Sequence, residues 1–292
     1  MSLEMRALLA LLLGAVGIGF APICVRLVEI EPVASAFWRL LLATPLLWLL
    51  ARGSGQRAAL GSISPAALKM AVLAGLAFAA DLGVWHYSIH FTSVANATLL
   101  ANLAPVFIAL WTYLIWRQPL RARYWLGLSL ALLGAAVLVN AGLGAHPRAL
   151  LGDGLGVLTA VFYAIYQLAI VAARRGMGTW QLMWISSLIA ALALLPFVLA
   201  SEQAMPAGWH DWGWLLALAL ISHVMGQGLI AYALAHLPAA FASVSLLLQP
   251  VAAAGFAWLI LAEVIGAMQA AGAAVVLFGI LLCRRPLKTT PV

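Results

Sequence analysis

The sequence predicts an all-α polytopic membrane protein, with ten transmembrane helices arranged as two inverted five-helix repeats. Three observations predict this fold class: an apolar composition, ten apolar segments and an internal repeat. Of the 292 residues, 66% are hydrophobic and only 8% are charged, whereas an ordinary soluble domain has roughly 25% charged residues. A soluble fold could not bury this much apolar surface, so we expect the chain to lie in a lipid bilayer.

Ten mostly apolar segments of about 18 to 25 residues are each long enough to cross a hydrocarbon core of roughly 30 Å as a helix. They cover residues 7–28, 33–51, 66–90, 95–116, 122–141, 153–173, 179–200, 212–236, 239–262 and 265–283. The connections between them are short, which leaves no room for a soluble domain.

Positive charges are distributed by side of the membrane. Twelve Lys and Arg residues fall on the side of the N-terminus: Arg6, Arg52, Arg57, Lys69, Arg117, Arg121, Arg123, Arg174, Arg175, Arg284, Arg285 and Lys288. The opposite side has only Arg26 and Arg148, and Arg39 lies within the second segment. Because Lys and Arg accumulate in cytoplasmic loops, we expect both termini in the cytoplasm. This topology accounts for the net charge of +7, so nucleic acid is not an expected partner.

An internal repeat appears when the sequence is shifted by 145 positions. The shift aligns Gly83 with Gly228, Tyr87 with Tyr232, Thr98 with Ser243, Pro105 with Pro250, Gln118 with Glu263, Gly127 with Gly272 and Gly134 with Gly279. Each half, residues 1–145 and 146–292, then holds five helices, and an odd number means that the second half enters from the opposite side. Inverted repeats are typical of alternating-access transporters, whose substrate sites lie near the midplane.

The repeated segments are TLLANLAPVFIALWTYLIWRQPLRARYWLGLSLALLGAAVLV and SVSLLLQPVAAAGFAWLILAEVIGAMQAAGAAVVLFGILL. With the length and the repeat, they resemble the drug/metabolite transporter superfamily in its EamA-type branch, and within it the YddG-type exporters of aromatic amino acids. That family places an acidic residue at the end of helices four and nine. Here Gln118 stands at the first of these positions, while Glu263 keeps the acid at the second. The resemblance implies a secondary exporter of the bacterial inner membrane, with an amino acid as small-molecule substrate and no cofactor.

Asp81 is the acidic residue that lies clearly inside a segment, roughly 18 Å from Lys69 at 1.5 Å per helical residue. Ionised groups are costly at this depth and normally face protein or a watery cavity. Two interpretations of Asp81 remain: a partner for a substrate ammonium or a proton, or a packed acid that is protonated or paired with Arg39. Arg39 could equally bind a substrate carboxylate or extend back to the membrane surface.

Histidines and amides recur at matching places of the two halves. His86 and His90 lie four residues apart and would share a helix face, yet no third ligand accompanies them, so we expect no metal site. We interpret them as the outer mouth of a cavity, where imidazoles titrate near neutral pH, or as surface residues. His223 and Gln227 form a similar polar stripe, which either lines the cavity or joins helices by hydrogen bonds.

Prolines interrupt the fourth and ninth segments at matching positions. Asn102 and Pro105 share one helix face, and Gln249 and Pro250 occupy the corresponding turn of the second half. A helical proline frees the carbonyl four residues earlier, at Leu246 in the second case. We expect such carbonyls either to face a substrate or simply to mark a kink.

Aromatic and amide side chains are predicted to form the walls of the cavity. The expected wall residues are Trp85, Tyr87, Tyr163, Tyr166, Gln167 and Tyr232. Aromatic faces stack on apolar substrates and attract cations, although tryptophan and tyrosine also gather at membrane surfaces. A further set of residues is predicted to act in gating or coupling and completes the predicted site: Arg39, His86, His90, Pro105, Pro250 and Glu263.

The sequence therefore favours a transporter of amino acids. A multidrug or metabolite exporter of the same fold, including nucleotide-sugar or purine efflux, is the alternative within transport. A membrane-embedded enzyme or scaffold is a third class, but the chain has neither a Walker motif nor a GxSxG nucleophile motif. We therefore do not expect an enzyme.

Overall fold

The computed structural model describes residues 1–54, 63–92, 94–139 and 147–284, and this part of the chain contains helices and connections without a strand. The first half holds α1 (Leu3–Gly19), α2 (Ala21–Leu27), α3 (Pro32–Gly53), α4 (Pro65–Ser88), α5 (Val94–Ala101), α6 (Ala104–Leu114) and α7 (Ala122–Val139). The second half holds α8 (Pro147–Ala173), α9 (Thr179–Leu199), α10 (Trp209–Ala217), the π-helix η2 (Leu218–Gln227), α11 (Gly228–Ala233), α12 (Ala239–Ser245), α13 (Leu248–Leu261) and α14 (Ala267–Cys283). The predicted boundary between repeats, at residue 145, lies outside the described residues.

Ten helical segments in the described part of the chain account for the predicted membrane crossings. Nine of them are at least 18 residues long and strongly apolar. The tenth is α14, an apolar helix of 17 residues. Four crossings consist of two or three consecutive elements: α1 with α2, α5 with α6, α10 through α11, and α12 with α13. The all-α membrane fold predicted from the sequence is thus confirmed.

The fourth and ninth crossings break at the positions where prolines were expected to act. Helix α5 ends one residue before Asn102, and Pro105 lies in the first turn of α6. Helix α12 likewise ends just before Leu246, and Pro250 lies in the first turn of α13. The Leu246 carbonyl accepts a hydrogen bond of 2.9 Å from the Gln249 N–H. The prediction that this carbonyl is free is therefore wrong, because a tighter turn satisfies it.

Glycines bring α7 and α14 into close antiparallel contact. A Cβ atom added at Gly134 would lie 2.7 Å from the Gly272 carbonyl oxygen, and one at Gly127 would lie 2.6 Å from the Gly279 carbonyl oxygen. Since Gly272 and Gly279 are the repeat partners of Gly127 and Gly134, each glycine meets the partner of the other. This reciprocity is what a two-fold axis in the membrane plane requires.

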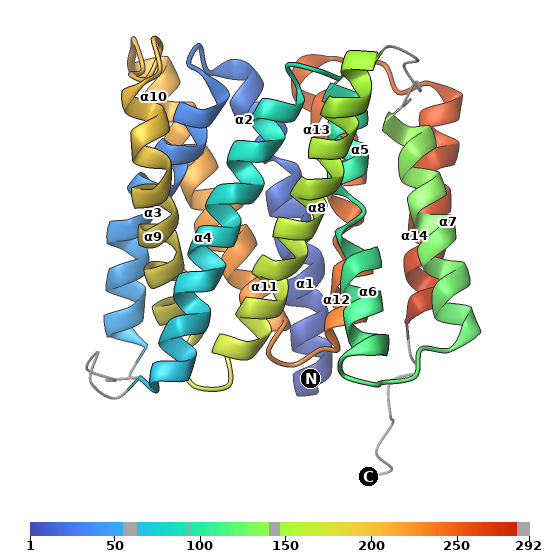
Figure 1. The fold of residues 1–292 in the computed structure, drawn as a ribbon. Helices are drawn as coiled ribbons and strands as arrows, with labels where there is room; N and C mark the ends of the chain where they lie inside the picture. Colours follow the sequence, from blue (N-terminus) through green and yellow to red (C-terminus); the bar gives the residue numbers. More distant parts are fainter. Residues whose placement is uncertain (55–62, 93, 140–146, 285–292) are drawn as a thin grey trace.

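The N-terminus and the end of α14 lie on the same face of the bundle (Figure 1). We call it the N-terminal face. Helices α3 and α8 also end there, and α4 and α7 begin there, so most basic residues of the chain belong to this face. The predicted separation of charge by side is therefore reproduced in space. Helices α7 and α14 form one end of the bundle, while α3, α9 and α10 lie at the other.

Candidate functional site

A buried group of polar and aromatic side chains lies between the two halves of the bundle. We call it the central cluster and define it as Arg39, Phe78, Asp81, Tyr163, Tyr166, His223, Gln227 and Gln249. Helices α3 and α4 supply the first three residues, while α8, η2 and α13 supply the others. Both repeats therefore contribute to it.

The Arg39 guanidinium points into the bundle. Its central carbon lies 5.4 Å from the centroid of the Phe78 ring, and its Nε and Nη2 atoms are buried without a hydrogen-bond partner among the described residues. The interpretation that Arg39 extends to the membrane surface is therefore wrong. An aromatic face attracts such a cation but leaves its N–H groups free to donate.

Asp81 interacts electrostatically with Arg39, Tyr163 and Tyr166. Arg39 and Asp81 do not form a direct ion pair, since the contacts shorter than 4.0 Å between opposite charges in the described part of the chain lie elsewhere. The Asp81 carboxyl and the Arg39 guanidinium therefore interact electrostatically without forming an ion pair. A ligand that carries both charges could contact each group.

Aromatic rings stack through the cluster and join the two halves. The Phe78 ring stacks on Tyr166, with 4.7 Å between centroids, and on His223, with 5.8 Å between centroids. Tyr163 stacks in turn on Tyr166 at 5.9 Å. Both tyrosines were predicted wall residues, and the structure brings them together.

Hydrogen bonds fix the second-half members of the cluster. The Tyr166 hydroxyl donates to Gln227 Oε1 at 3.3 Å, and Gln249 Nε2 donates to the Tyr163 hydroxyl at 3.5 Å. The polar atoms of Gln167, which follows Tyr166 in α8, are buried without a partner among the described residues. A buried amide without a hydrogen-bond partner costs free energy, and a bound ligand that supplied the missing hydrogen bonds would remove that cost.

One ring nitrogen of His223 forms a hydrogen bond, and the other has no hydrogen-bond partner among the described residues. Its Nε2 lies 2.7 Å from Ser187 Oγ, and the Ser187 hydroxyl donates its single hydrogen to the Met183 carbonyl. The network therefore assigns the Nε2–H of His223 as the donor to Ser187. In the neutral ring this leaves Nδ1 as an acceptor, and Nδ1 has no partner in the described residues.

His223 and Gln227 belong to a π-helix of ten residues inside the eighth crossing. Helices of this type are rare and occur frequently at functional sites. The two side chains share a face, as the sequence predicted, and both contact the central cluster.

Several predicted site residues lie outside the cluster. Tyr87 is 57% exposed near the end of α4, where its ring contacts His90 at 6.3 Å. His86 belongs to the same helix, but its side chain lies outside the described residues. Tyr232 packs on His236 with 4.8 Å between centroids, beside a cavity of about 680 Å³ that opens on the N-terminal face. Trp85 is half-buried in α4.

The breaks and the far end of the bundle hold the remaining predicted residues. Asn102 and Pro250 are half-buried and Pro105 is buried, all at the breaks in the fourth and ninth crossings. Glu263, which follows α13, accepts a hydrogen bond of 2.6 Å from Arg26 Nη1 at the face opposite the N-terminus. This exposed ion pair joins the ends of the first and ninth crossings.

Sequence reasoning missed Phe78 and Ser187. Phe78 precedes Asp81 by three residues, a spacing that places both side chains on one helix face, so the charged residue could have identified it. Ser187 lies in an apolar helix and shows no pattern of its own, because its partner His223 comes from a distant segment.

These features define a class: a helical membrane protein with inverted halves, interrupted crossings and a buried polar cluster where the halves meet, as in secondary transporters. The profile of the EamA-like transporter family matches residues 5–140 and 150–285. The chain belongs to this family, and it is a multi-pass membrane transporter.

Relatives agree with this assignment, and a solved structure agrees with the fold. The chain is 28% identical over 253 residues to the pseudopaline exporter CntI from two strains of Pseudomonas aeruginosa, with 86% of each chain covered. It is 26% identical over 274 residues to an uncharacterized transporter from Archaeoglobus fulgidus, with 90% of this chain and 91% of the relative covered. A solved crystal structure matches with a TM-score of 0.80, 18% identity and 96% coverage of both chains, which shows the fold.

Proposed function

We propose that this protein exports amino acids, including aromatic and other apolar ones, across the bacterial inner membrane by alternating access. Family membership supports export of a small molecule, and the central cluster supports the substrate class. The observation that carries the proposal is Arg39, whose buried guanidinium is held over Phe78 with two nitrogens left without a partner in the described residues.

The chemistry of the cluster matches the three parts of an amino acid. The free N–H groups of Arg39 suit a carboxylate, which guanidinium groups bind through paired hydrogen bonds. Asp81 and the Nδ1 atom of His223 offer acceptors for an ammonium group. The rings of Phe78 and Tyr163 offer apolar faces on which a side chain can stack.

A broader metabolite exporter is the second candidate. The amide of Gln167 is buried without a partner in the described part of the chain, and such a group suits a substrate with more polar atoms than an amino acid has. A relative named as a pseudopaline exporter is compatible with this candidate. In both cases the free N–H groups of Arg39 would donate to an acceptor on the substrate.

Counterflow into liposomes that contain the purified protein tests the proposal. We expect radiolabelled phenylalanine and leucine to accumulate against an internal pool, and we expect uptake to fail in Arg39→Gln. Arg52→Gln is the matched control, because Arg52 also lies over an aromatic ring, 3.8 Å from the centroid of Trp48, but near the N-terminal face. Uptake of a nucleoside or drug without uptake of any amino acid would contradict the substrate class.

We further propose that the N-terminal face is cytoplasmic, as its basic residues indicate, and that each half, 1–145 and 146–292, forms one repeat. Single cysteines in a Cys24→Ser/Cys283→Ser background test the orientation in intact cells. Ser2→Cys should react with a membrane-impermeant maleimide only after permeabilisation, whereas Gly208→Cys, at the start of α10 on the opposite face, should react at once. The reverse pattern would invert the topology.

A further inference from the structure

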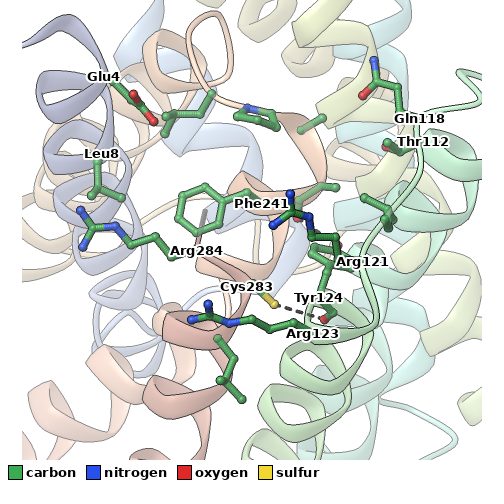
Figure 2. Close-up of a pocket in the computed structure, with 16 residues that line it drawn as sticks. Glu4, Leu8, Thr112, Gln118, Arg121, Arg123, Tyr124, Phe241, Cys283 and Arg284 are labelled. Atoms are coloured by element: carbon green, nitrogen blue, oxygen red, sulfur yellow. Dashed lines mark hydrogen bonds between the residues drawn. The ribbon is translucent and has the colours of Figure 1, made fainter. Parts of the chain in front are cut away.

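A cavity of about 170 Å³ opens on the N-terminal face between α1, α7, α12 and α14. Three arginines line it, Arg121 and Arg123 at the start of α7 and Arg284 after α14. Figure 2 shows the ring of Phe241 between Arg284 and Arg121, with Arg123 at the same mouth. The cavity has several times the volume that one water molecule needs.

A buried hydroxyl points to a ligand in this cavity. Thr112, in α6, is 3% exposed and lines the cavity, and its Oγ1 atom has no hydrogen-bond partner among the described residues. A buried hydroxyl is normally paired, because an unpaired one has lost its hydrogen bonds to water without gaining others. Thr112 therefore offers a donor to a group that the chain itself does not provide.

The arginines of this cavity form no ion pair with the acidic residues that the structure describes. In the described part of the chain no carboxylate lies within 4.0 Å of Arg121, Arg123 or Arg284. The one acid that lines the cavity, Glu4, lies on the same side of Phe241 as Arg284 and on the other side from Arg121 in Figure 2, and it forms no ion pair with either arginine. The cavity is therefore suited to an anion.

The two faces of the bundle differ at the repeat positions 118 and 263. At the opposite face Glu263 pairs with Arg26 at 2.6 Å, which neutralises the only arginine there whose contacts the structure describes. The repeat partner of Glu263 is Gln118, which lines the cavity and brings no charge. Gln118 therefore offers no carboxylate to the three arginines that line the same cavity.

We propose that this cavity binds the phosphate group of an anionic phospholipid of the leaflet at the N-terminal face. Arg121 and Arg123 would bind the phosphate oxygens as charge-assisted donors, with Thr112 as a further donor. Arg284, on the other side of Phe241, adds positive charge to the same cavity. The backbone N–H groups in the first turn of α7 add the positive end of a helix of 18 residues.

The apolar part of the lining favours a lipid over a free phosphate ion. Leu8 of α1 and Leu282 of α14 line the cavity beside Phe241. Phe278, four residues before Leu282 on the same face of α14, is 56% exposed and continues this apolar surface toward the bilayer. A phosphate held at the arginines would carry an acyl chain along this surface, whereas an inorganic ion would gain nothing from it.

Native mass spectrometry of the full chain tests the site, with phosphatidylglycerol as the anionic probe and phosphatidylcholine as its zwitterionic control. We expect retention of phosphatidylglycerol to weaken roughly 100-fold in Arg121→Gln/Arg123→Gln/Arg284→Gln, since each arginine near an anionic surface contributes about fivefold. The matched control, Arg6→Gln/Arg52→Gln/Lys69→Gln, removes three positive charges from residues of the same face that do not line the cavity. It should change retention less than about threefold, because salt screens exposed charges that do not contact the phosphate.

Thr112→Val provides a second test in case the triple variant folds poorly. Because it removes an unpaired hydroxyl at nearly constant volume, it should not lower the melting temperature of the lipid-free protein, and it should reduce the thermal shift that phosphatidylglycerol produces. Equal loss of lipid in the triple variant and its control would overturn the site. Displacement of phosphatidylglycerol by millimolar inorganic phosphate would overturn its assignment to a lipid. Counterflow of amino acids is read separately, so failure here does not affect the proposed substrate.

Discussion

Phe78 is the residue that joins the charged and aromatic parts of the central cluster. Its ring contacts Arg39 from the first half and stacks on Tyr166 and His223 from the second half. We predict that Phe78→Leu, which keeps most of the apolar volume and removes the aromatic face, destabilises the protein and impairs transport together.

The magnitude of the loss follows from these three contacts. Two stacked pairs contribute about 0.5 to 1.5 kcal/mol each, and a largely buried cation over a ring contributes about 1 to 2 kcal/mol. Phe78→Leu should therefore lower the free energy of unfolding by about 2 to 5 kcal/mol. A misplaced Arg39 would lose a charged hydrogen bond of about 1.5 to 3 kcal/mol to a substrate carboxylate, which weakens apparent affinity by about 10- to 150-fold.

Unfolding in mixed micelles and counterflow in liposomes measure the two effects. A double-mutant cycle with Arg39→Met isolates the contact between the guanidinium and the ring, and we expect a coupling energy of about 1 to 2 kcal/mol. Phe37→Leu is the matched control. Phe37 is 8% exposed and has one aromatic partner, Trp38, at 5.4 Å, so its substitution should cost about 0.5 to 1.5 kcal/mol through that pair and show no coupling to Arg39.

A coupling energy near zero would refute the placement of Arg39 over Phe78. Wild-type counterflow in Phe78→Leu, despite the expected loss of stability, would refute the idea that the ring positions the guanidinium for substrate. If Phe37→Leu lowered the free energy of unfolding as much as Phe78→Leu does, the loss would reflect general core packing and not the contact between Arg39 and Phe78.

Three further predictions concern packing, charge and the far face. Gly134→Ala should destabilise the protein by about 1 to 3 kcal/mol, because the added Cβ would lie 2.6 Å from a backbone nitrogen of α14. Gly154→Ala, with open space around it, should not destabilise the protein, and thermal unfolding in detergent compares the two variants. Asp81→Asn should lower counterflow without reducing membrane insertion, and wild-type rates would assign Asp81 to structure alone. Glu263→Gln should change unfolding free energy by less than about 1 kcal/mol, because its pair with Arg26 is exposed; a larger loss would mean that the pair is buried in another state.

Much of the fold was predictable because membrane crossings leave a strong local signal. Length and hydropathy located the ten crossings, and the proline pair Pro105 and Pro250 located two of the four interrupted crossings, the fourth and the ninth. Local rules failed at finer detail. A proline was expected to free the carbonyl of Leu246, but the chain closes a tighter turn with the Gln249 N–H, an adjustment that depends on how α12 and α13 pack.

The site was predictable in its polar residues and not in their partners. Tyr166, His223 and Gln227 stood out because polar groups are costly in a membrane, and all three lie in the central cluster. Whether Arg39 turned inward or toward the surface depended on Phe78, an apolar residue in an apolar helix that carries no such signal. Tyr87, in contrast, lies at the surface, because an aromatic residue near the end of a crossing suits the membrane interface equally well.

The position of the central cluster has a mechanical consequence for alternating access. Arg39 and Asp81 belong to the first half, whereas His223 and Gln249 belong to the second, and the stacked ring of Phe78 bridges them. Each bridging contact is worth about 1 kcal/mol, so movement of one half against the other can break them at modest cost. A zwitterionic substrate that contacts both halves would stabilise the arrangement of the halves in which those contacts can form. Because a ligand shifts an equilibrium only by its difference in affinity for the two states, a substrate that spans this junction is coupled directly to the motion that carries it.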